Sequence, residues 1–410
     1  MKNARQILDD LLRETPDAAR ARERSAFDEI VAGRRKVVIF GAGRLGRKIL
    51  QGLSGTDLKA VAYADNNSRL WGKTVDGLPV LSPQEAAQQH SADATFIVAI
   101  WHPSREPLMA ALLTQLMLLA CRATSFPLLF WRYPGKFLPH FFWDLPSRLL
   151  DQVERIRAAF DLLKDDLSRQ AFVGQIQLRL RADFVCIGSP APGEQYFPNL
   201  FSMSADECFV DCGAYTGDTI QSFLGQSSGL FRKVIAFEAD PSVLPALETL
   251  QIDVGSRIVL YKAAVGAYNG VASFAGDGIG GGCVTEGPGT EVPCVRLDDA
   301  LAAEHPSFIK MDIEGAEIQA LEGAYRVIRQ DRPVLAVCGY HRPDHFWRVP
   351  LFLKTLAPDS TLFLRTHCAD GLDSVFYAVP PERRTTGIRH TLRRSIATKK
   401  SRPRTSGSKS

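Results

Sequence analysis

The chain has 410 residues, of which 45% are hydrophobic and 23% are charged, and its formal net charge is +4. This composition is that of an ordinary globular protein, and the length exceeds the roughly 250–300 residues at which one hydrophobic core usually stops growing, so we expect two domains. The sequence has no apolar run of the ~18 residues that a spanning helix needs, so we expect no transmembrane segment.

Residues 1–30 are charged and amphipathic, which predicts an N-terminal helix and not a signal peptide. The eight cysteines are scattered without a CxxC pair, and most lie in apolar runs. This usage is typical of reduced thiols in the cytoplasm, where we expect the protein to be located.

The pattern over residues 31–130 predicts a first Rossmann-like domain. Short apolar strands are predicted at Lys36–Phe40, Lys59–Ala64 and Thr95–Ile100, with helices between them. Strands that alternate with helices indicate a parallel, doubly wound sheet.

The glycine-rich turn GAGRLG follows the first of these strands. Gly41, Gly43 and Gly46 have the spacing of a dinucleotide fingerprint, and Asp65 ends the second strand. Three interpretations stay open: an NAD site, a nucleotide or nucleotide-sugar site at the helix N-terminus, or a turn with a purely structural role. We favour the nucleotide or nucleotide-sugar site.

Residues 131–206 read as a connector. An aromatic and proline-rich stretch, FWRYPGKFLPHFFWDLP, is followed by apolar positions spaced three and four apart over 147–180. That spacing predicts a one-sided helix, and we expect the aromatic residues to pack between the domains.

Residues 207–380 read as a second doubly wound domain. Its strands are predicted at Cys208–Cys212, Lys233–Glu238, Arg257–Lys262, Phe308–Ile313, Pro333–Cys338, Thr361–Arg365 and Val375–Val379. The last three would close the sheet after a cofactor-binding half. The predicted fold class is therefore α/β with two Rossmann-like domains.

A second glycine-rich turn, VDCGAYTGDT, follows the first of these strands. Asp211, Gly213 and Gly217 form a DxGxxxG pattern, and Glu238 ends the next strand. A carboxylate there can accept hydrogen bonds from both ribose hydroxyls of an adenosine. Because S-adenosylmethionine carries an ammonium and a sulfonium but no phosphate, an acidic rim fits it better than NAD.

We therefore predict an S-adenosylmethionine site. Small residues after the third strand, in the sequence AAVG, would let the adenine ring lie flat. The residues predicted to bind the donor are Asp211, Gly213, Ala214, Tyr215, Gly217, Thr219, Glu238, Ala239, Ala264, Val265 and Asp312.

The sequence KMDIEGAE ends the fourth strand, where the crevice of such a sheet lies. Methyl transfer to a hydroxyl needs alignment and removal of one proton, and Asp312 is the best candidate for the base, with Glu314 second. Either carboxylate could instead cap the following helix, or the pair could hold a divalent cation. We assign no metal ligand from the sequence.

His341, just past a later strand, is predicted to be an acceptor-site residue or an auxiliary base. Its spacing from Cys338 and His345 could suit zinc, but no fourth ligand is evident. The segment Gly276–Gly289 holds seven glycines and is either a lid over the acceptor or a simple connection.

Residues 381–410 carry ten Lys or Arg and one acid, a net charge of +9, so residues 1–380 carry about −5. Without an apolar period, this basic tail is predicted to be disordered. A nucleic-acid or anionic-membrane role is conceivable, but we expect a solvated end and no nucleic-acid partner.

The motifs VDCGAYTGDT, FEADP, AAVG, VRLDD and KMDIEGAEIQAL together resemble the FkbM family of S-adenosylmethionine-dependent methyltransferases, over 207–380. The resemblance implies a class I methyltransferase fold and O-methylation of sugars, glycans or polyketide-type products. It departs from the family at Tyr215, where a smaller or amide residue is common. That ring could cover the methionine end of the donor.

The segment around GAGRLG, ADNNSRLWGKTVDGLPVLSP and TFIVAI is similar to a domain of bacterial sugar-modifying enzymes of polysaccharide pathways. This similarity implies a saccharide or nucleotide-sugar as the acceptor. Two other functions stay open: an NAD-dependent oxidoreductase that uses the first turn, and a non-catalytic binding protein.

Overall fold

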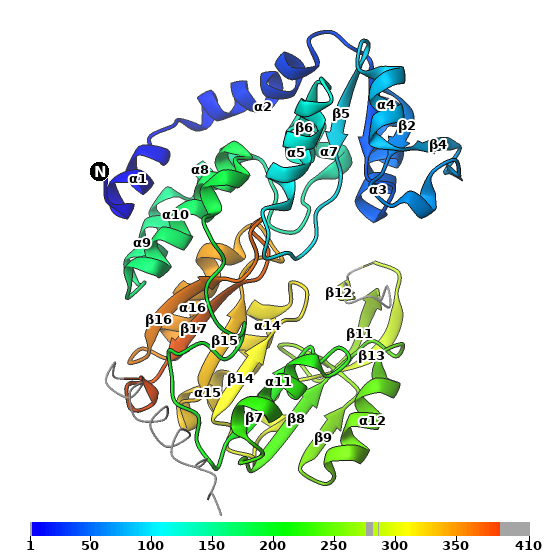
Figure 1. The fold of residues 1–410 in the computed structure, drawn as a ribbon. Coiled ribbons are helices and arrows are strands. Elements are labelled where there is room, and N and C mark those ends of the chain that lie inside the picture. The colour runs from blue at the N-terminus through cyan, green and yellow to red at the C-terminus, as the bar shows by residue number, and fades with distance from the viewer. Residues whose placement is uncertain (1, 276–281, 286, 386–410) are drawn as a thin grey trace, which may run out of the picture.

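The computed structural model describes residues 2–275, 282–285 and 287–385. It has the expected α/β fold class, with two mainly parallel sheets in the N-terminal and C-terminal halves of the chain (Figure 1). A layer of helices lies between them on one side, and the first helices of the chain run along the outside of that layer (Figure 1).

The prediction of a single N-terminal helix over residues 1–30 is wrong, because two helices occupy this segment. They are α1 (Ala4–Leu11) and α2 (Pro16–Val31). Thr15 caps α2 through its side chain and Pro16 occupies the first helical position, where its missing N–H costs nothing. The chain therefore restarts a helix at this point.

The N-terminal sheet has the strand order β3-β4-β2-β1-β5-β6, and only the β3–β4 pair is antiparallel. Its strands are β1 (Lys36–Phe40), β2 (Lys59–Ala64), β3 (Thr74–Val75), β4 (Leu78–Leu81), β5 (Ala94–Val98) and β6 (Ala123–Ser125). The helices between them are α3 (Arg44–Leu53), the 3₁₀ turn η1 (Ser68–Leu70), α4 (Pro83–His90) and α5 (Leu108–Leu118). The strand predicted at Thr95–Ile100 is thus β5, shifted by one or two residues.

The segment predicted as a connector is packed onto both halves of the chain. It contains α6 (Phe126–Arg132), α7 (Pro134–Phe137), α8 (Pro146–Leu150), α9 (Val153–Asp161), α10 (Asp166–Arg181) and the 3₁₀ turn η2 (Phe184–Ile187). The one-sided helix predicted over 147–180 is broken into three, because Asp165 caps a new helix by accepting a hydrogen bond from the amide of Ser168 at 2.8 Å. α2 packs on α6 and α8, and α1 packs on α10.

The C-terminal sheet has the strand order β16-β17-β15-β14-β7-β8-β9, with β17 antiparallel to both neighbours. Its strands are β7 (Cys208–Cys212), β8 (Lys233–Phe237), β9 (Ile258–Tyr261), β14 (Phe308–Met311), β15 (Val334–Cys338), β16 (Thr361–Thr366) and β17 (Ser374–Val379). The helices are α11 (Asp218–Ser227), α12 (Leu244–Val254), α13 (Leu297–Ala300), α14 (Glu317–Gly323), α15 (Tyr325–Asp331) and α16 (His345–Leu356), followed by the 3₁₀ turn η3 (Pro381–Arg383). All seven predicted strands are present.

A small mixed sheet, which the sequence analysis did not predict, lies between β9 and β14 in the chain. Its order is β10-β13-β11-β12, formed by β10 (Ala264–Val265), β11 (Gly270–Ala275), β12 (Cys283–Thr285) and β13 (Thr290–Val295). The lid expected at Gly276–Gly289 falls in part outside the described residues, and so does the tail from residue 386 on.

Two further expectations concern thiols and membrane insertion. All eight cysteines lie in the described residues, where no disulfide joins them, and six of them are buried. Across the described part of the chain, every helix is too short or too polar to cross a bilayer.

The VRLDD motif has a structural role that the sequence did not reveal. Asp298 is buried, and its Oδ1 accepts hydrogen bonds from the amides of Arg326 and Val327 at 2.8 and 2.9 Å. These amides belong to the first turn of α15, whose own preceding residue provides no side-chain cap. Asp298 therefore caps a helix that is distant in sequence.

We expect Asp298→Ala to lower the free energy of unfolding by about 1–3 kcal/mol, because two amides of the first turn of α15 lose their acceptor. Urea denaturation followed by circular dichroism measures the change. The matched control is Asp299→Ala, whose carboxylate is 45% exposed and should contribute less than about 1 kcal/mol. Equal losses in both variants would contradict the capping role.

Candidate active site

The candidate site lies where the strand order of the C-terminal sheet reverses. β7 lies between β14 and β8, so the connections that leave β7 and β14 diverge and open a crevice at their carboxyl ends. A pocket occupies this position, lined by Pro103, Gln195, Tyr196, Gly213, Tyr215, Asp218, Thr219, Phe237, Glu238, Ala239, Asp240, Ala263, Ala264, Val265, Phe274, Gly282, Val284, Lys310, Asp312, Ile313, Glu314, Ala316, Tyr340 and Asp373.

A buried ion pair supports the pocket from below. Lys310 Nζ lies 2.8 Å from Asp211 Oδ1, and both side chains are at most 3% exposed. The same ammonium donates a hydrogen bond to the carbonyl oxygen of Gly213 at 2.6 Å. Burial raises the pKa of Asp211 to about 6, although the charge of Lys310 acts in the opposite direction. Lys310 thus joins the ends of β7 and β14.

Gly213 allows these two strand ends to approach each other. Its φ of +83° lies in the left-handed region, and a Cβ added there would lie 1.9 Å from the carbonyl oxygen of Asp312. Tyr215 and Gly217 also have positive φ, which turns the chain tightly into α11. The glycines of this turn are therefore required by backbone packing as well as by any ligand.

Glu238, at the end of β8, receives three backbone hydrogen bonds. Its Oε2 accepts from the amide of Tyr215 at 2.7 Å, and its Oε1 accepts from the amides of Ala239 and Asp240 at 2.8 and 2.7 Å. Burial raises the pKa of Glu238, and these amides act in the opposite direction. Three of the four lone-pair sites of the carboxylate are thus used, and the remaining one, on Oε2, could accept a ribose hydroxyl.

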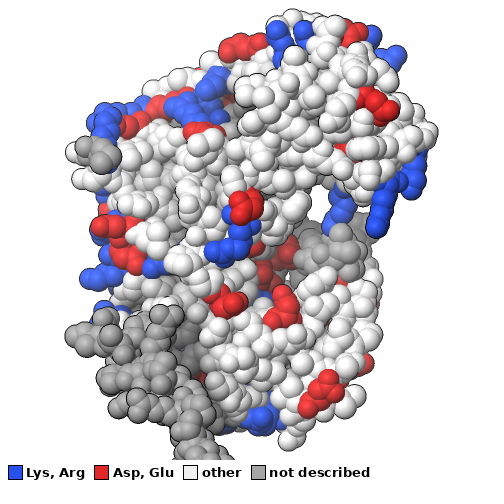
Figure 2. Space-filling model, in the orientation of Figure 1, with Lys and Arg blue, Asp and Glu red and all other residues white. Residues whose placement is uncertain are grey.

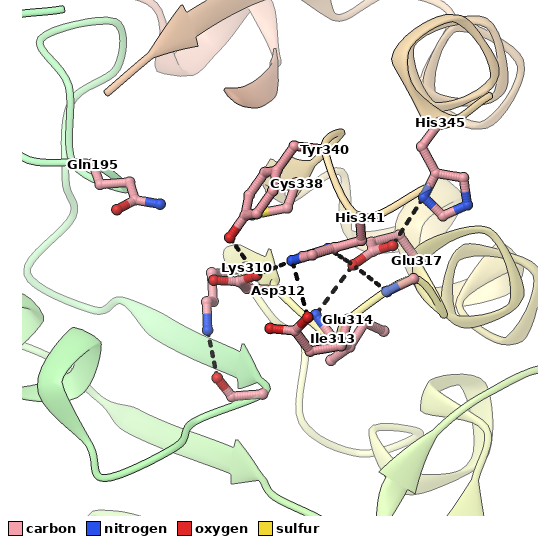
Figure 3. A network of polar contacts seen from close by, with 12 residues as sticks. Gln195, Lys310, Asp312, Ile313, Glu314, Glu317, Cys338, Tyr340, His341 and His345 are labelled. Carbon is pink, nitrogen blue, oxygen red and sulfur yellow. Dashed lines mark hydrogen bonds and ion pairs between the residues drawn. The ribbon is translucent and has the colours of Figure 1, made fainter. Parts of the chain in front are cut away.

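Asp312 is the centre of a polar network at the end of β14 (Figure 3). Its Oδ2 accepts a hydrogen bond from the hydroxyl of Tyr196 at 2.6 Å. Its Oδ1 lies 3.2 Å from Nε2 of His341 and 3.4 Å from the hydroxyl of Tyr340. The carboxylate is thus held in one orientation at the edge of the pocket.

A second carboxylate, Glu317, positions the histidines behind Asp312. It is fully buried, and its Oε1 lies 2.7 Å from Nδ1 of His341 while its Oε2 lies 3.0 Å from Nδ1 of His345. Figure 3 shows the imidazole ring of His341 between Glu317 on one side and the carboxylates of Asp312 and Glu314 on the other. Glu317 also accepts backbone hydrogen bonds from the turn before α14.

The charges of this network shift its pKa values in opposite directions. Burial alone would raise the pKa of Asp312, but its close contact with His341 and the charges of His341 and Lys310 hold the pKa well below its usual range. Burial alone would lower the pKa of His341, but Glu317 and Glu314 raise it well above its usual value. Asp312 is therefore ionised at neutral pH and His341 is cationic beside it.

The pocket has an acidic lining. Asp218, Glu238, Asp240, Asp312, Glu314 and Asp373 contribute carboxylates, whereas Lys310 is the single Lys or Arg among its described lining residues. Figure 2 shows acidic side chains gathered around a hollow on the face in view. Such a field attracts a positively charged ligand and repels a phosphate.

Comparison with known proteins agrees with this geometry. Residues 211–366 match the sequence profile of the methyltransferase FkbM domain. These residues are an FkbM methyltransferase domain. Membership implies S-adenosylmethionine as the methyl donor, and the acidic pocket suits its positive charge.

The similarity in fold extends beyond the FkbM domain. The crystal structure of Methyltransferase FkbM from Methylobacillus flagellatus KT superposes with a TM-score of 0.76 and 22% sequence identity, covering 90% of this chain and 99% of that one. An overlap of this extent includes most of the N-terminal sheet, so the two proteins share the arrangement of both halves.

Two other solved structures overlap far less. A precorrin-6y C5,15-methyltransferase from Geobacter metallireducens GS-15 has a TM-score of 0.27 and 14% identity, covering 43% of this chain and 80% of that one. An SAH-bound Podospora anserina methyltransferase has a TM-score of 0.25 and 11% identity, covering 55% and 86%. Neither supports an inference about this chain. A comparison with curated protein sequences gave no significant match.

The FkbM domain brings most of the residues predicted for the donor into one pocket. Those that line it are Gly213, Tyr215, Thr219, Glu238, Ala239, Ala264, Val265 and Asp312. The other three lie outside its lining: Asp211 is fully buried beneath it, Ala214 is 1% exposed, and Gly217 shapes the turn. Asp211 therefore acts on the pocket through Lys310.

The residues predicted for catalysis also converge. Asp312 and Glu314 line the pocket, and His341 lies behind them. The carboxylate that accepts the amides of this turn is Glu317, at 3.2 and 3.3 Å from the amides of Ile313 and Gly315. The sequence predicts this capping role for Asp312 or Glu314, and the structure gives it to Glu317 instead.

The zinc trio that the spacing of Cys338, His341 and His345 suggested does not form. Both histidines contact Glu317, whereas Cys338 Sγ lies 3.5 Å from the hydroxyl of Tyr196.

Sequence reasoning missed Lys310, Tyr196, Tyr340 and Glu317. Lys310 had a usable signal, since a charged residue inside the apolar strand FIKM must find a partner when it is buried. Tyr196 had none, because it lies in an irregular loop 116 residues before Asp312.

Packing accounts for two of the three glycines of the first glycine-rich turn. A Cβ on Gly46 would lie 1.9 Å from the carbonyl oxygen of Gly41, and a Cβ on Gly41 would lie 2.6 Å from Ile100. Gly43 faces open space. Asp65 accepts hydrogen bonds from the amides of Ala42 and Asn67, both at 2.8 Å. A nucleotide or nucleotide-sugar ligand here stays a prediction.

We expect Gly213→Ala to weaken S-adenosylmethionine binding by at least tenfold. The added Cβ would force the turn over 213–217, here called the donor turn, away from β14, at a cost of roughly 1–3 kcal/mol in backbone strain. Isothermal titration calorimetry measures the affinity. Gly225→Ala is the control, because this glycine lies in α11 with no atom within 4 Å of an added Cβ. Unchanged affinity in Gly213→Ala would contradict the role of the close approach.

Proposed function

We propose that this protein is an S-adenosylmethionine-dependent O-methyltransferase that acts on a hydroxyl of a saccharide or sugar-bearing metabolite. The observation that carries the proposal is the position of the Asp312 carboxylate. It is ionised and oriented by two tyrosine hydroxyls and His341, and it lines the pocket that also holds the predicted donor residues.

The reaction needs little from the protein beyond alignment. The acceptor oxygen attacks the methyl carbon of the sulfonium in line, so that the O–CH₃ bond forms as the S–CH₃ bond breaks and neutral S-adenosylhomocysteine leaves. The hydroxyl proton passes to a carboxylate, for which Asp312 is our first candidate and Glu314 our second. Glu238 would hold the ribose hydroxyls of the donor.

The acceptor side of the pocket supports a polar, hydroxyl-rich ligand. Gln195, Tyr196, Tyr340 and Asp373 line it alongside Asp312. Pro103 also lines it, from the loop between β5 and α5 of the N-terminal half. The N-terminal half thus supplies part of the wall, where it could contact an acceptor that extends beyond the reacting hydroxyl.

The alternatives from the sequence have less support. An NAD-dependent oxidoreductase would use Asp65 on the ribose, and the acidic pocket around Asp312 would have no role in its reaction. A binding protein without catalysis would not need Asp312 held at the pocket edge. Titration with NADH distinguishes the first alternative, and the transfer assay below distinguishes the second.

Glu238→Ala should weaken S-adenosylmethionine binding by about 10- to 100-fold, because the hydroxyls of the ribose lose a charged acceptor. The donor-induced rise in melting temperature should disappear with it. Glu248→Ala, a surface carboxylate paired with Lys262 on the same side of the sheet, is the matched control. No response of the wild-type protein to the donor would refute the proposed function.

Asp312→Asn should lower the rate of methyl transfer by about 10²–10⁴-fold, because the neutral amide cannot take the hydroxyl proton. The assay is transfer of a labelled methyl group from S-adenosylmethionine to nucleotide-sugars and cell-derived glycans. Donor affinity and melting temperature, measured in parallel, separate loss of chemistry from loss of folding. Unchanged turnover would exclude Asp312 as the base.

A further inference from the structure

The geometry points to a divalent-cation site formed by Asp312, Glu314 and His341, at which the cation binds oxygen atoms of the acceptor. The second part of this inference rests on the proposed function. The first part, the binding of the cation itself, does not.

The three side chains bring their possible metal-ligand atoms close together. Nε2 of His341 lies 3.2 Å from Oδ1 of Asp312 and 3.7 Å from Oε2 of Glu314, and the three groups can place one ligand atom each within 4.8 Å of one another. Adjacent ligands of an octahedral cation with bonds of ~2.1 Å lie about 3 Å apart. The two distances from Nε2 are somewhat longer than this, so the three side chains would draw together around the cation to form one face of such an octahedron.

His341 adds a buried ring nitrogen to the two carboxylates of this cluster. Its side chain is 1% exposed, and its Nε2 is buried, points at the two carboxylates, and makes no hydrogen bond of good geometry. Burying a polar nitrogen without a hydrogen-bond or metal partner costs free energy. A cation between Nε2 and the two carboxylates would be that partner.

The other ring nitrogen is held as metal-binding histidines usually are. Nδ1 of His341 lies 2.7 Å from Oε1 of the fully buried Glu317. A cation that binds here displaces the proton of Nε2. A carboxylate that accepts the Nδ1–H then fixes the tautomer in which Nε2 carries the lone pair, and it raises the basicity of that nitrogen. Glu317 is itself fixed by His345 and by two backbone amides.

The position of Glu314 depends on an uncommon backbone conformation. Glu314 and Gly315 have φ values of +53° and +103°, so the chain turns sharply between β14 and α14. This turn places Glu314 at the pocket, next to Asp312, where both carboxylates line the wall.

The chemical type of the three ligand atoms and their position at the pocket favour a cation such as Mn²⁺ or Mg²⁺. Two carboxylates with one imidazole suit such an ion, which prefers oxygen ligands and six-coordination. Three protein ligands leave three positions open, and the two carboxylates face the pocket. A hydroxyl and a neighbouring oxygen of a saccharide could take two of them as a chelate, which would place the hydroxyl and increase its acidity.

Direct binding of Mn²⁺ to the full chain, after treatment with a chelator, tests the cation site without donor or acceptor. Electron paramagnetic resonance of free Mn²⁺ counts the bound ions, and we expect one per chain. Glu314→Gln is the main variant because its side chain is 21% exposed and the substitution should leave folding intact; it should weaken Mn²⁺ binding by at least about tenfold.

Two further variants sharpen the test. Glu317→Gln, which alters a positioning residue, should weaken Mn²⁺ binding by about 10- to 100-fold with one ion still bound at saturation. Asp218→Asn removes another carboxylate of the same pocket that is outside the trio, and it should bind Mn²⁺ as the wild type does. The melting temperature of each variant without metal shows whether the fold is retained.

Absence of Mn²⁺ binding by the wild type, or equal binding by Glu314→Gln and Asp218→Asn, would overturn the cation site. Loss of methyl transfer with EDTA and its return with Mn²⁺ would support the role in acceptor binding, whereas full activity in EDTA would overturn that role. Mn²⁺ binding in a protein that shows no methyl transfer would support the cation site and refute the proposed function, so the two failures are distinguishable.

Discussion

The buried contact between Lys310 and the end of β7 is the interaction on which the site depends. Its ammonium binds Asp211 and the carbonyl of Gly213, so the first strand of the FkbM domain is tied to β14. A charge buried this deeply is retained only with a close partner. The donor turn on one side and Asp312 on the other therefore have a fixed separation.

The polar network extends outward from this point in layers. The ion pair of Lys310 and Asp211 lies beneath the pocket, Asp312 and Glu314 line it, and His341 with Glu317 lies behind them. His341, which contacts Glu317, orients Asp312 from behind, and Asp312 and Glu314 present their carboxylates to the pocket. This arrangement yields an acidic and rigid pocket, which suits a cationic donor and leaves a defined place for an acceptor hydroxyl.

The N-terminal half contributes to the pocket through a loop, and not through its glycine-rich turn. Its loop before α5 reaches the pocket through Pro103, and α5 is anchored by Asp370, which accepts a hydrogen bond from the amide of Met109 at 2.9 Å. Trp101 of the same loop donates a hydrogen bond from Nε1 to the carbonyl oxygen of Asp370 at 3.0 Å. The two sheets are joined by contacts close to the site.

The sequence by itself determined the fold class, the seven strands of the larger sheet and the donor turn, because strand periodicity, the DxGxxxG pattern and Glu238 are local signals. It also placed Asp312 and Glu314 at a strand end. Only the tertiary structure decided that Asp211 is buried under the pocket, that Tyr196 reaches Asp312, and that Glu317 orients His341. These contacts join residues that lie in separate elements or in an irregular loop, and their spacing along the chain carries no period that could reveal them.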